Sequence, residues 1–398
     1  MLYKYRFTLL FYSILATVFV LLLVKTELAL SISYKEAVNL YINHSILSVI
    51  TNASTFLFGD NDLALRTPFI ILYLLSVILM YLITENYFKY EKDRFISIIL
   101  FMALPGVLSA SLLVNTAIIT TFFTLLYIYY YEKKRKHLYY LLPFLLFVDN
   151  AFAILFLALF LFSLRSKDKK LLYFSLVLFF LSIFIYGFST DGRPRGYLFD
   201  TFGIYATIFS PLVFLYFIYA LYRSAILRDR SLTWYISITA LLLSILISFR
   251  QRVFIEDFAP FVVIATPIMV KMFLNSYRVR LKEFRKTYNL IASVTIILLF
   301  LNVLFTFISK PLYLVLSEPR KHFVYQYHFA KELAQELKTR DIDYIYFEDS
   351  ELALRQRFYG IKEGTSYYLS NSEFYNYDEK IVISYYSKEL FSVYIKKL

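Results

Sequence analysis

Runs of 16 to 19 mostly apolar residues recur along most of this chain and constrain its fold more than any other feature. Each run is about long enough for a helix to cross a hydrocarbon core roughly 30 Å thick. Backbone polar groups in lipid must be satisfied within their own segment, so these runs are predicted to be helices. We expect membrane spans near residues 7–24, 68–84, 96–113, 116–131, 171–188, 204–222, 233–249, 259–275 and 290–308.

The charged residues predict how these spans are oriented. The net charge is +13, and the basic residues lie mostly in short loops between the predicted spans. This positive-inside pattern assigns those loops and the N terminus to the cytoplasm, and it accounts for the charge without a nucleic-acid partner. The loops that alternate with them then face the outside: 25–67, 114–115, 189–203 and 250–258. The first run, 7–24, is longer than a usual signal-peptide core, and we expect it to be retained.

Residues 138–164 break this alternation because basic loops flank them at both ends. The chain must therefore leave and return on the same side, in a run too short for two ordinary spans. We expect a hairpin of two short helices that folds at 148–150, with Asp149 at its tip. Counting both arms gives about 11 membrane segments, with the C terminus outside.

The composition changes after residue 308. A helical pattern at 327–340 is followed by strand-like patterns at 343–347, 365–369, 380–386 and 390–395. This order predicts a small α/β domain on the outer face. The expected fold is thus an α-helical polytopic membrane domain over 1–308, with a long outer loop at 25–67, followed by a soluble α/β domain over 309–398.

Several classes of site are excluded by the sequence. The chain has no Cys, which excludes disulfides, thiolate metal ligands and a thiol nucleophile. It also has no phosphate-binding loop of the Walker type, no GxGxxG and no serine elbow, so a nucleotide-driven pump and a cytosolic-type hydrolase are not expected.

Glu36 is the acidic residue of the outer loop best placed for chemistry. It begins a helical pattern with Ala37, Leu40 and Tyr41 that can lie at the membrane–water boundary. A carboxylate held there can act as a general base if burial raises its pKa. A solvated charge that stabilises the start of a helix is the simpler interpretation, and the sequence leaves both open.

Two arginine pairs in other outer loops depart from the positive-inside pattern: Arg193 with Arg195, and Arg250 with Arg252. Guanidinium groups bind phosphate oxygens bidentately, which suits a lipid phosphate or diphosphate. The alternatives are anchoring to lipid headgroups or ion pairs with the nearby acids, which are Asp191, Asp200, Glu256 and Asp257.

Two further residues are candidates for supporting roles. Asp149 is an ionisable residue within the predicted membrane region and is therefore a functional candidate, although at a hairpin tip it can also reach water or cap a helix. His44 has no second ligand at metal-binding spacing, so a structural hydrogen bond is the simpler role for it. No metal site is predicted.

The order of these parts resembles the C-type membrane glycosyltransferases. The similarity is greatest to the family 39 branch, with the protein O-mannosyltransferases and the lipid A aminoarabinose transferases. The resemblance covers roughly residues 1–310, including the middle outer loop and the span after it. The matching residues in the first outer loop and the second span are Glu36-Ala37, His44, Leu57-Phe58-Gly59, Asp62, Ala64-Leu65-Arg66 and Pro68.

The resemblance implies an enzyme of the inner (cytoplasmic) membrane whose donor is a polyprenyl-phosphate-linked sugar. Glu36 would be the base on an acceptor lipid, glycan or protein, while Arg66 and the four outer-loop arginines would bind the lipid phosphate. His44, Asp62, Asn115 and Asp149 would have supporting roles. No cofactor is certain, and a divalent metal requirement stays open.

The sequence departs from the family pattern at three places. Lys35 stands where the family has its first acid, Ser45-Ile46 replaces a Pro-Pro pair, and Asn115 replaces an Asp near the fourth span. Asn can form hydrogen bonds but cannot take a proton. The alternative function is therefore a relative that binds a polyprenyl lipid or a partner without turnover. A transporter ranks last, since only Asp149 and Lys271 are charged residues within the spans.

Overall fold

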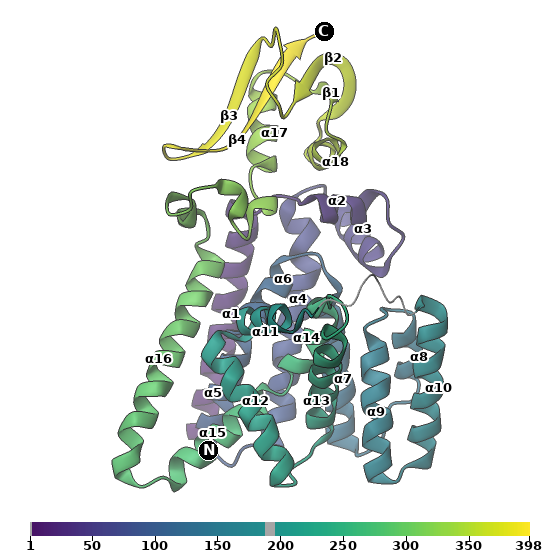
Figure 1. Cartoon of the computed structure of the whole chain (residues 1–398), viewed down its shortest axis with the longest axis vertical. Helices are drawn as coiled ribbons and strands as arrows, with labels where there is room; N and C mark the ends of the chain where they lie inside the picture. Colours follow the sequence, from purple (N-terminus) through teal and green to yellow (C-terminus); the bar gives the residue numbers. More distant parts are fainter. Residues whose placement is uncertain (1, 188–195) are drawn as a thin grey trace. The chain divides into compact units, whose positions relative to one another are not determined.

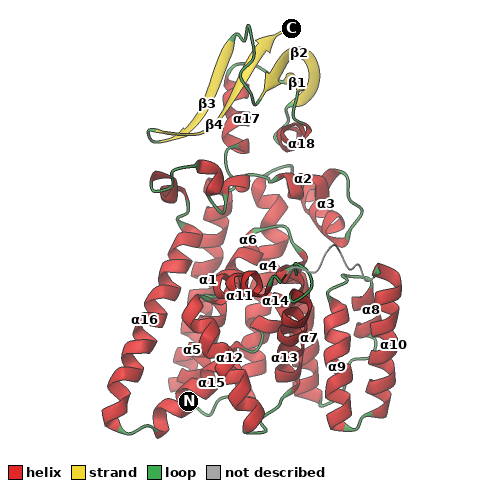
Figure 2. Cartoon of the chain, viewed as in Figure 1, coloured by secondary structure: helices red, strands yellow, loops and turns green. Residues whose placement is uncertain are grey.

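The computed structural model describes residues 2–187 and 196–398, and helices dominate it (Figures 1 and 2). The α-helices are α1 (Leu2–Ala29), α2 (Tyr34–Tyr41), α3 (Ile46–Phe58), α4 (Asp62–Ile83), α5 (Glu91–Met102), α6 (Pro105–Leu112), α7 (Thr116–Lys134), α8 (Leu141–Leu146), α9 (Phe152–Ser166), α10 (Lys169–Tyr186), α11 (Leu198–Phe209), α12 (Pro211–Ile226), α13 (Leu232–Ser248), α14 (Ile255–Val263), α15 (Thr266–Val279), α16 (Lys282–Phe307), α17 (Ala330–Thr339) and α18 (Ser350–Phe358). Short 3₁₀ helices are η1 (Thr84–Asn86), η2 (Lys310–Leu314), η3 (Pro319–Lys321) and η4 (Tyr325–Tyr327), and the strands are β1 (Tyr344–Phe347), β2 (Lys362–Ser370), β3 (Glu379–Tyr385) and β4 (Lys388–Lys397).

The chain divides into two compact units. The first comprises Met1–Thr17 and Ile71–Thr306, and the second comprises Val18–Ile70 and Phe307–Leu398. The second unit thus combines the long loop predicted at 25–67 with the C-terminal region, whereas the sequence had assigned that loop to the membrane domain. Each unit is described by itself.

The prediction of membrane-spanning helices is confirmed in its general form. Four described helical segments are long and apolar enough to cross a membrane: Arg6–Ala29, Asp62–Asn86, Lys169–Tyr186 and Lys282–Phe307. Up to seven spans result if each of three bent helix pairs counts as one. The predicted number of 11 segments is not confirmed.

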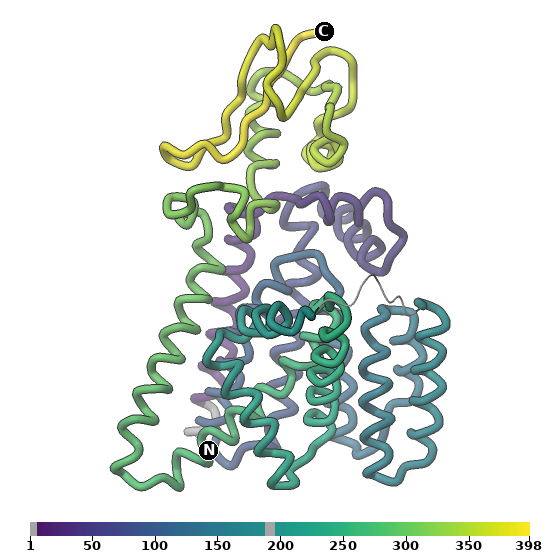
Figure 3. The backbone as a smooth tube through the Cα atoms, in the orientation of Figure 1, coloured from purple at the N-terminus to yellow at the C-terminus, as the bar shows by residue number. Residues whose placement is uncertain are grey.

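The three bent pairs correspond to the spans expected at 96–113, 204–222 and 259–275. The bends are 54° between α5 and α6, 103° between α11 and α12, and 45° between α14 and α15. A proline is the first residue of α6 and of α12, Pro105 and Pro211, and the second residue of α15, Pro267. Proline disfavours helical conformation in the residue before it, which accounts for the non-helical backbone at Leu104 and Ser210. Figure 3 shows the sharp turn between α11 and α12.

The predicted hairpin over 138–164 corresponds to α8 and α9. Helix α8 ends at Leu146 and α9 begins at Phe152, so the chain turns where the sequence indicated. Figure 3 shows α8, α9 and α10 running side by side, and α9 also packs against α13. Helix α8 has only six residues, which is too short to cross a bilayer at 1.5 Å per residue.

The second unit contains all four described strands, which confirms the small C-terminal sheet (Figure 2). The strand order is β1-β2-β4-β3; β1 and β2 are parallel, and the other neighbouring pairs are antiparallel. Helix α17 buries Ala330, Leu333, Ala334 and Leu337, which lie on one face at helical spacing. Leu333, Ala334 and Leu337 share a core with Ile345, Leu369, Ile381, Val393 and Ile395 of the sheet.

Candidate functional site

Glu36 lies in the first turn of α2, within a reciprocal cap. The Ser33 hydroxyl accepts from the Glu36 N–H, and Glu36 Oε2 accepts from the Ser33 N–H at 2.9 Å. This capping box satisfies two backbone donors at the helix start. The Glu36 side chain is buried, with only 2% of its surface exposed. It is therefore not the solvated helix-start charge of the simpler sequence interpretation.

Arg66 is fully buried at the start of α4 and joins two acids. Its Nη2 donates to Glu36 Oε2 at 2.8 Å and to the carbonyl of Ser31 at 2.9 Å. Its Nη1 pairs with Asp62 Oδ1 at 3.1 Å, one helical turn away. A buried charge must be paired to be tolerated, and here two carboxylates provide that pairing.

Local sequence chemistry fixes where α4 begins. The Asn61 side chain accepts from the Ala64 N–H at 2.7 Å, which caps the helix. Pro68 has no N–H to offer the carbonyl of Ala64, and the Ser54 hydroxyl donates to that carbonyl instead. These contacts set the turn from which Asp62 and Arg66 extend.

The C-terminal region of the same unit completes this group. The Tyr359 hydroxyl donates to Asp62 at 3.0 Å and accepts from the Ile32 N–H at 2.9 Å. Lys331 Nζ lies 3.4 Å from Asp62 Oδ2. Burial and then the Asp62 charge raise the pKa of Tyr359 well above its usual value, so its hydroxyl keeps the proton that it donates. We call Glu36, Asp62, Arg66, Lys331 and Tyr359 the Arg66 cluster.

Arg355 attaches α18 to the strand-like segment before α2. Its guanidinium donates to the carbonyls of Ile32, Gln326 and His328, at 2.9, 3.1 and 3.1 Å. Burial lowers its pKa to about 10, so it still carries its charge at neutral pH. Its positive charge therefore adds to those of Arg66 and Lys331 near the two carboxylates.

The chemistry open to the Arg66 cluster follows from its donors. Glu36 Oε2 receives hydrogen bonds from Ser33 and Arg66. Arg66 Nε and Ser31 Oγ are buried and have no hydrogen-bond partner among the described residues. These two groups are available for an anionic oxygen or a hydroxyl. The residues that the structure describes contain no group of three or more His, Asp or Glu suited to a metal ion.

The structure brings together three of the residues predicted for the site, Glu36, Asp62 and Arg66. His44 is exposed in the turn between α2 and α3. In the first unit, Asn115 caps α7 by accepting from the Ala117 N–H at 3.0 Å, and Asp149 accepts from the Ala151 N–H at 2.8 Å.

Two of the four predicted outer-loop arginines are among the described residues. Arg250 and Arg252 are exposed in the first unit, and neither side chain has an ion pair with a described residue. Arg193 and Arg195 lie outside the described residues. Lys271, which a transporter would need inside the membrane, pairs with the exposed Asp229 at 3.0 Å.

Lys331, Arg355 and Tyr359 were missed from the sequence. They lie 295 or more positions beyond Ser31 and Glu36, and no local motif marks them. With 38 Tyr in the chain, one further tyrosine carries no signal by itself.

Tyr359→Phe is expected to loosen the attachment of α2. The change leaves the Ile32 N–H and Asp62 each without one buried partner, which costs about 1–3 kcal/mol. Because the chain has no Cys, Ala37→Cys provides a single thiol probe on α2. Its labelling by a maleimide should become faster in Tyr359→Phe and stay unchanged in Tyr346→Phe, whose side chain is exposed. Equal labelling in the two variants would contradict the assigned role of the hydroxyl.

His328 is expected to make the second unit sensitive to acid. Burial, followed by Lys25, Lys310 and His322, lowers its pKa to about 3. In the unfolded chain the pKa of a His is about 6.5. Between pH 3 and pH 6.5 the unfolded chain therefore binds a proton at His328 that the folded chain does not bind. The contribution of neutral His328 to the free energy of unfolding is complete above pH 6.5. It falls by about 1.4 kcal/mol per pH unit as the pH drops toward 3.

The thiol probe for this prediction is Ala334→Cys in the core of the second unit. Labelling, normalised to the unfolded chain at each pH, should accelerate from pH 7.5 to pH 5. His328→Asn keeps a donor for the Tyr313 hydroxyl, which lies 2.7 Å from His328 Nδ1, and should remove most of this dependence. His44→Asn, at an exposed site, should leave it intact. A pH profile that is the same in all three proteins would refute the assignment.

Comparison with solved structures gives a similarity of fold. No protein-family model matches the chain, and no curated protein matches it. The solved structure of ArnT from Cupriavidus metallidurans in the apo state is similar to it with a TM-score of 0.47 and 11% sequence identity. The match covers 89% of this chain and 75% of that one. A similarity at this level carries no inference about activity.

Proposed function

We propose that this protein transfers a sugar from a polyprenyl-phosphate-linked donor to an acceptor lipid, glycan or protein. The observation that carries the proposal is the convergence of Glu36, Asp62 and Arg66 on one buried site. The same three residues belong to the sequence pattern that resembles the C-type membrane glycosyltransferases. The proposed location is the outer face of the inner membrane, with the N terminus in the cytoplasm and the C-terminal domain in the periplasm.

The proposed reaction needs one base and one stabilised leaving group. Glu36 would take the proton of the acceptor hydroxyl or amine while the acceptor atom bonds to the anomeric carbon of the sugar. The bond between that carbon and the phosphate oxygen breaks, and its electron pair stays on the phosphate. Guanidinium groups would stabilise this charge, with Arg66, Arg193, Arg195, Arg250 and Arg252 as the proposed ligands.

The ion pair between Glu36 and Arg66 gives this proposal a specific order of events. A carboxylate paired with a guanidinium is a weak base, because the positive charge favours its ionised form. A lipid phosphate that binds Arg66 would weaken the ion pair between Arg66 and Glu36. Glu36 would then be a stronger base. The unpartnered Arg66 Nε and Ser31 Oγ supply hydrogen bonds that such a phosphate can accept. Binding of the donor would in this way prepare the base.

The second candidate function is lipid binding without turnover. It is favoured by the burial of Glu36, whose Oε2 already receives bonds from Ser33 and Arg66. Lys35 in place of the first acid of the family pattern, and the capping role of Asn115, favour it as well. Under this hypothesis the Arg66 cluster only stabilises the scaffold.

Mass spectrometry of the purified chain tests the proposal. Extraction in mild detergent should retain a polyprenyl phosphate, part of it still carrying a sugar. Incubation with a membrane extract that supplies acceptor lipids, glycans and proteins should convert the sugar-bearing form into free polyprenyl phosphate in the wild type. Recovery of a sugar-bearing lipid that is never converted would favour binding without turnover, and recovery of no polyprenyl lipid would contradict both candidates.

A further inference from the structure

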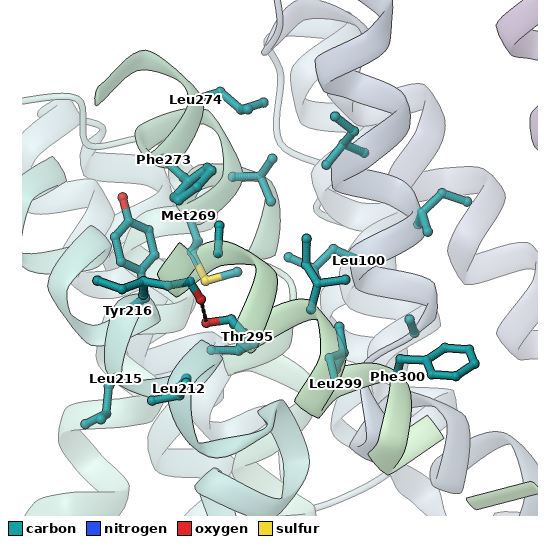
Figure 4. A pocket seen from close by; sticks show the side chains of 18 of the residues that line it. Leu100, Leu212, Leu215, Tyr216, Met269, Phe273, Leu274, Thr295, Leu299 and Phe300 are labelled. Carbon is teal, nitrogen blue, oxygen red and sulfur yellow. Dashed lines mark hydrogen bonds between the residues drawn. The ribbon is translucent and has the colours of Figure 1, made fainter. Parts of the chain in front are cut away.

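A cavity of about 820 Å³ lies within the first unit, between α5, α12, α15 and α16 (Figure 4). Its walls are nearly all hydrocarbon and include Leu100, Leu212, Met269, Phe273 and Leu299. None of the described residues that line it is charged. The polar groups on its walls are three tyrosines and Thr295, and the hydroxyls of Tyr216 and Tyr288 lie 3.3 Å apart. The cavity is therefore suited to an apolar chain.

The cavity exists because α16 packs loosely. Of the 26 residues of this helix, only Leu299 is buried. An apolar space of this size cannot remain empty in a bilayer, because its walls would lose their dispersion contacts. A hydrocarbon chain from the bilayer fills it at no cost in polar desolvation.

One end of the cavity has a cationic rim. The guanidinium of Arg280 lies 4.3 Å from the ring centre of Tyr288, which lines the cavity. Arg285 donates to the Arg280 carbonyl at 2.9 Å, and Lys282 and Lys286 lie on the same first turns of α16. We call Arg280, Lys282, Arg285 and Lys286 the basic rim.

The charges of the basic rim are not compensated within the described chain. None of its four residues forms an ion pair with a described residue. Arg278, just before it, differs because it pairs with Asp93 at the start of α5. Cations beside an apolar cavity complement a ligand with an anionic head and a hydrocarbon tail.

We propose that the cavity and the basic rim form a binding site for an anionic glycerophospholipid. One acyl chain occupies the space between α16 and its neighbours, and the phosphate of the headgroup is bound by Arg280 and Lys282. The positive-inside pattern assigns this end to the cytoplasmic leaflet, which carries the anionic lipids. The proposal does not depend on the proposed function, whose chemistry belongs to the other face. The lipid would also fix α16 against the rest of the first unit.

Native mass spectrometry of the full chain tests this site. The chain is reconstituted in nanodiscs that contain equal amounts of phosphatidylglycerol and phosphatidylcholine with identical acyl chains, and the lipid retained on release is identified. We expect about a tenfold preference for phosphatidylglycerol, since each Lys or Arg adds attraction for an anionic surface. The preference should decline as salt is raised.

Two pairs of variants test the basic rim and the apolar cavity separately, each with a matched control. Arg280→Gln with Lys282→Gln should abolish the preference, while Lys134→Gln with Lys136→Gln, exposed basic residues of another loop, should retain it. Ala292→Phe fills the cavity from α16 and should reduce retention of both lipids. Ser293→Phe places the same ring on the exposed face of that helix and should retain both.

Four results would overturn the proposal. Equal retention of the two lipids by the wild type would do so, as would a preference that survives Arg280→Gln with Lys282→Gln at any salt concentration. Displacement of phosphatidylglycerol by an equimolar polyprenyl phosphate would assign the cavity to that lipid instead. A dimer that excludes lipid from α16 would assign it to a second copy of the chain.

Discussion

Arg66→Leu is expected to lower the free energy of unfolding of the second unit by about 3–5 kcal/mol, the cost of breaking a buried ion pair by removing one partner. The leucine leaves Glu36 and Asp62 buried without the guanidinium that they share. It also leaves the carbonyl of Ser31 without its donor. The loss should appear as faster maleimide labelling of the Ala37→Cys probe on α2.

Two further variants control this prediction. Arg340→Leu removes a partly exposed arginine that pairs with Glu336 and Glu379 in the same unit, and it should cost no more than about 1 kcal/mol. Adding Glu36→Gln and Asp62→Asn to Arg66→Leu should recover part of the stability, because no unpaired charge then stays buried. If Arg66→Leu lowered the free energy of unfolding by no more than Arg340→Leu does, the Arg66 cluster would contribute little to the stability of the second unit.

Glu36→Gln is expected to reduce sugar transfer by about 10²- to 10⁴-fold, the usual contribution of a general base. The amide has the size of the carboxylate but cannot accept the acceptor's proton. Its oxygen can still accept from Ser33, and Arg66 keeps Asp62, so α2 should stay in place. Turnover of a donor in nanodiscs, together with labelling of Ala37→Cys, separates a chemical defect from an unfolding one.

The control for Glu36→Gln is Glu363→Gln, at an exposed position of β2 in the same unit. It should transfer sugar at the wild-type rate. If Glu36→Gln retained that rate as well, Glu36 would be a structural residue and the base would have to be another group. If Glu36→Gln exposed the Ala37→Cys thiol, the loss of transfer would carry no information about a base.

Much of the fold could be predicted because it depends on local chemistry. Apolar length predicted the long helices, and alternation of side chains predicted the four strands of the second unit. Three spans predicted at 96–113, 204–222 and 259–275 are bent helix pairs in the structure. Hydropathy over a window does not register local breaks such as those before Pro105 and Pro211, although both prolines are visible in the sequence.

The candidate site was predictable only in part. Ser33 and Glu36 have the spacing of a capping box, and Asp62 and Arg66 have the spacing of neighbours on a helix, so each pair is encoded locally. The meeting of the two pairs depends on how α2 and α4 pack. The hydrogen bond from Tyr359 to Asp62 joins positions almost 300 residues apart. No periodic pattern in a single sequence predicts such a contact.

The most direct test of the proposed function is turnover by the wild-type chain of the lipid-linked sugar that is recovered with it. That donor is returned to the delipidated protein in nanodiscs together with a membrane extract that supplies the acceptor, and both bound donor and released polyprenyl phosphate are measured. Wild type and Glu36→Gln should bind the donor equally, and only the wild type should release polyprenyl phosphate repeatedly. Binding by both proteins with release by neither would contradict the proposed function and leave a lipid-binding scaffold.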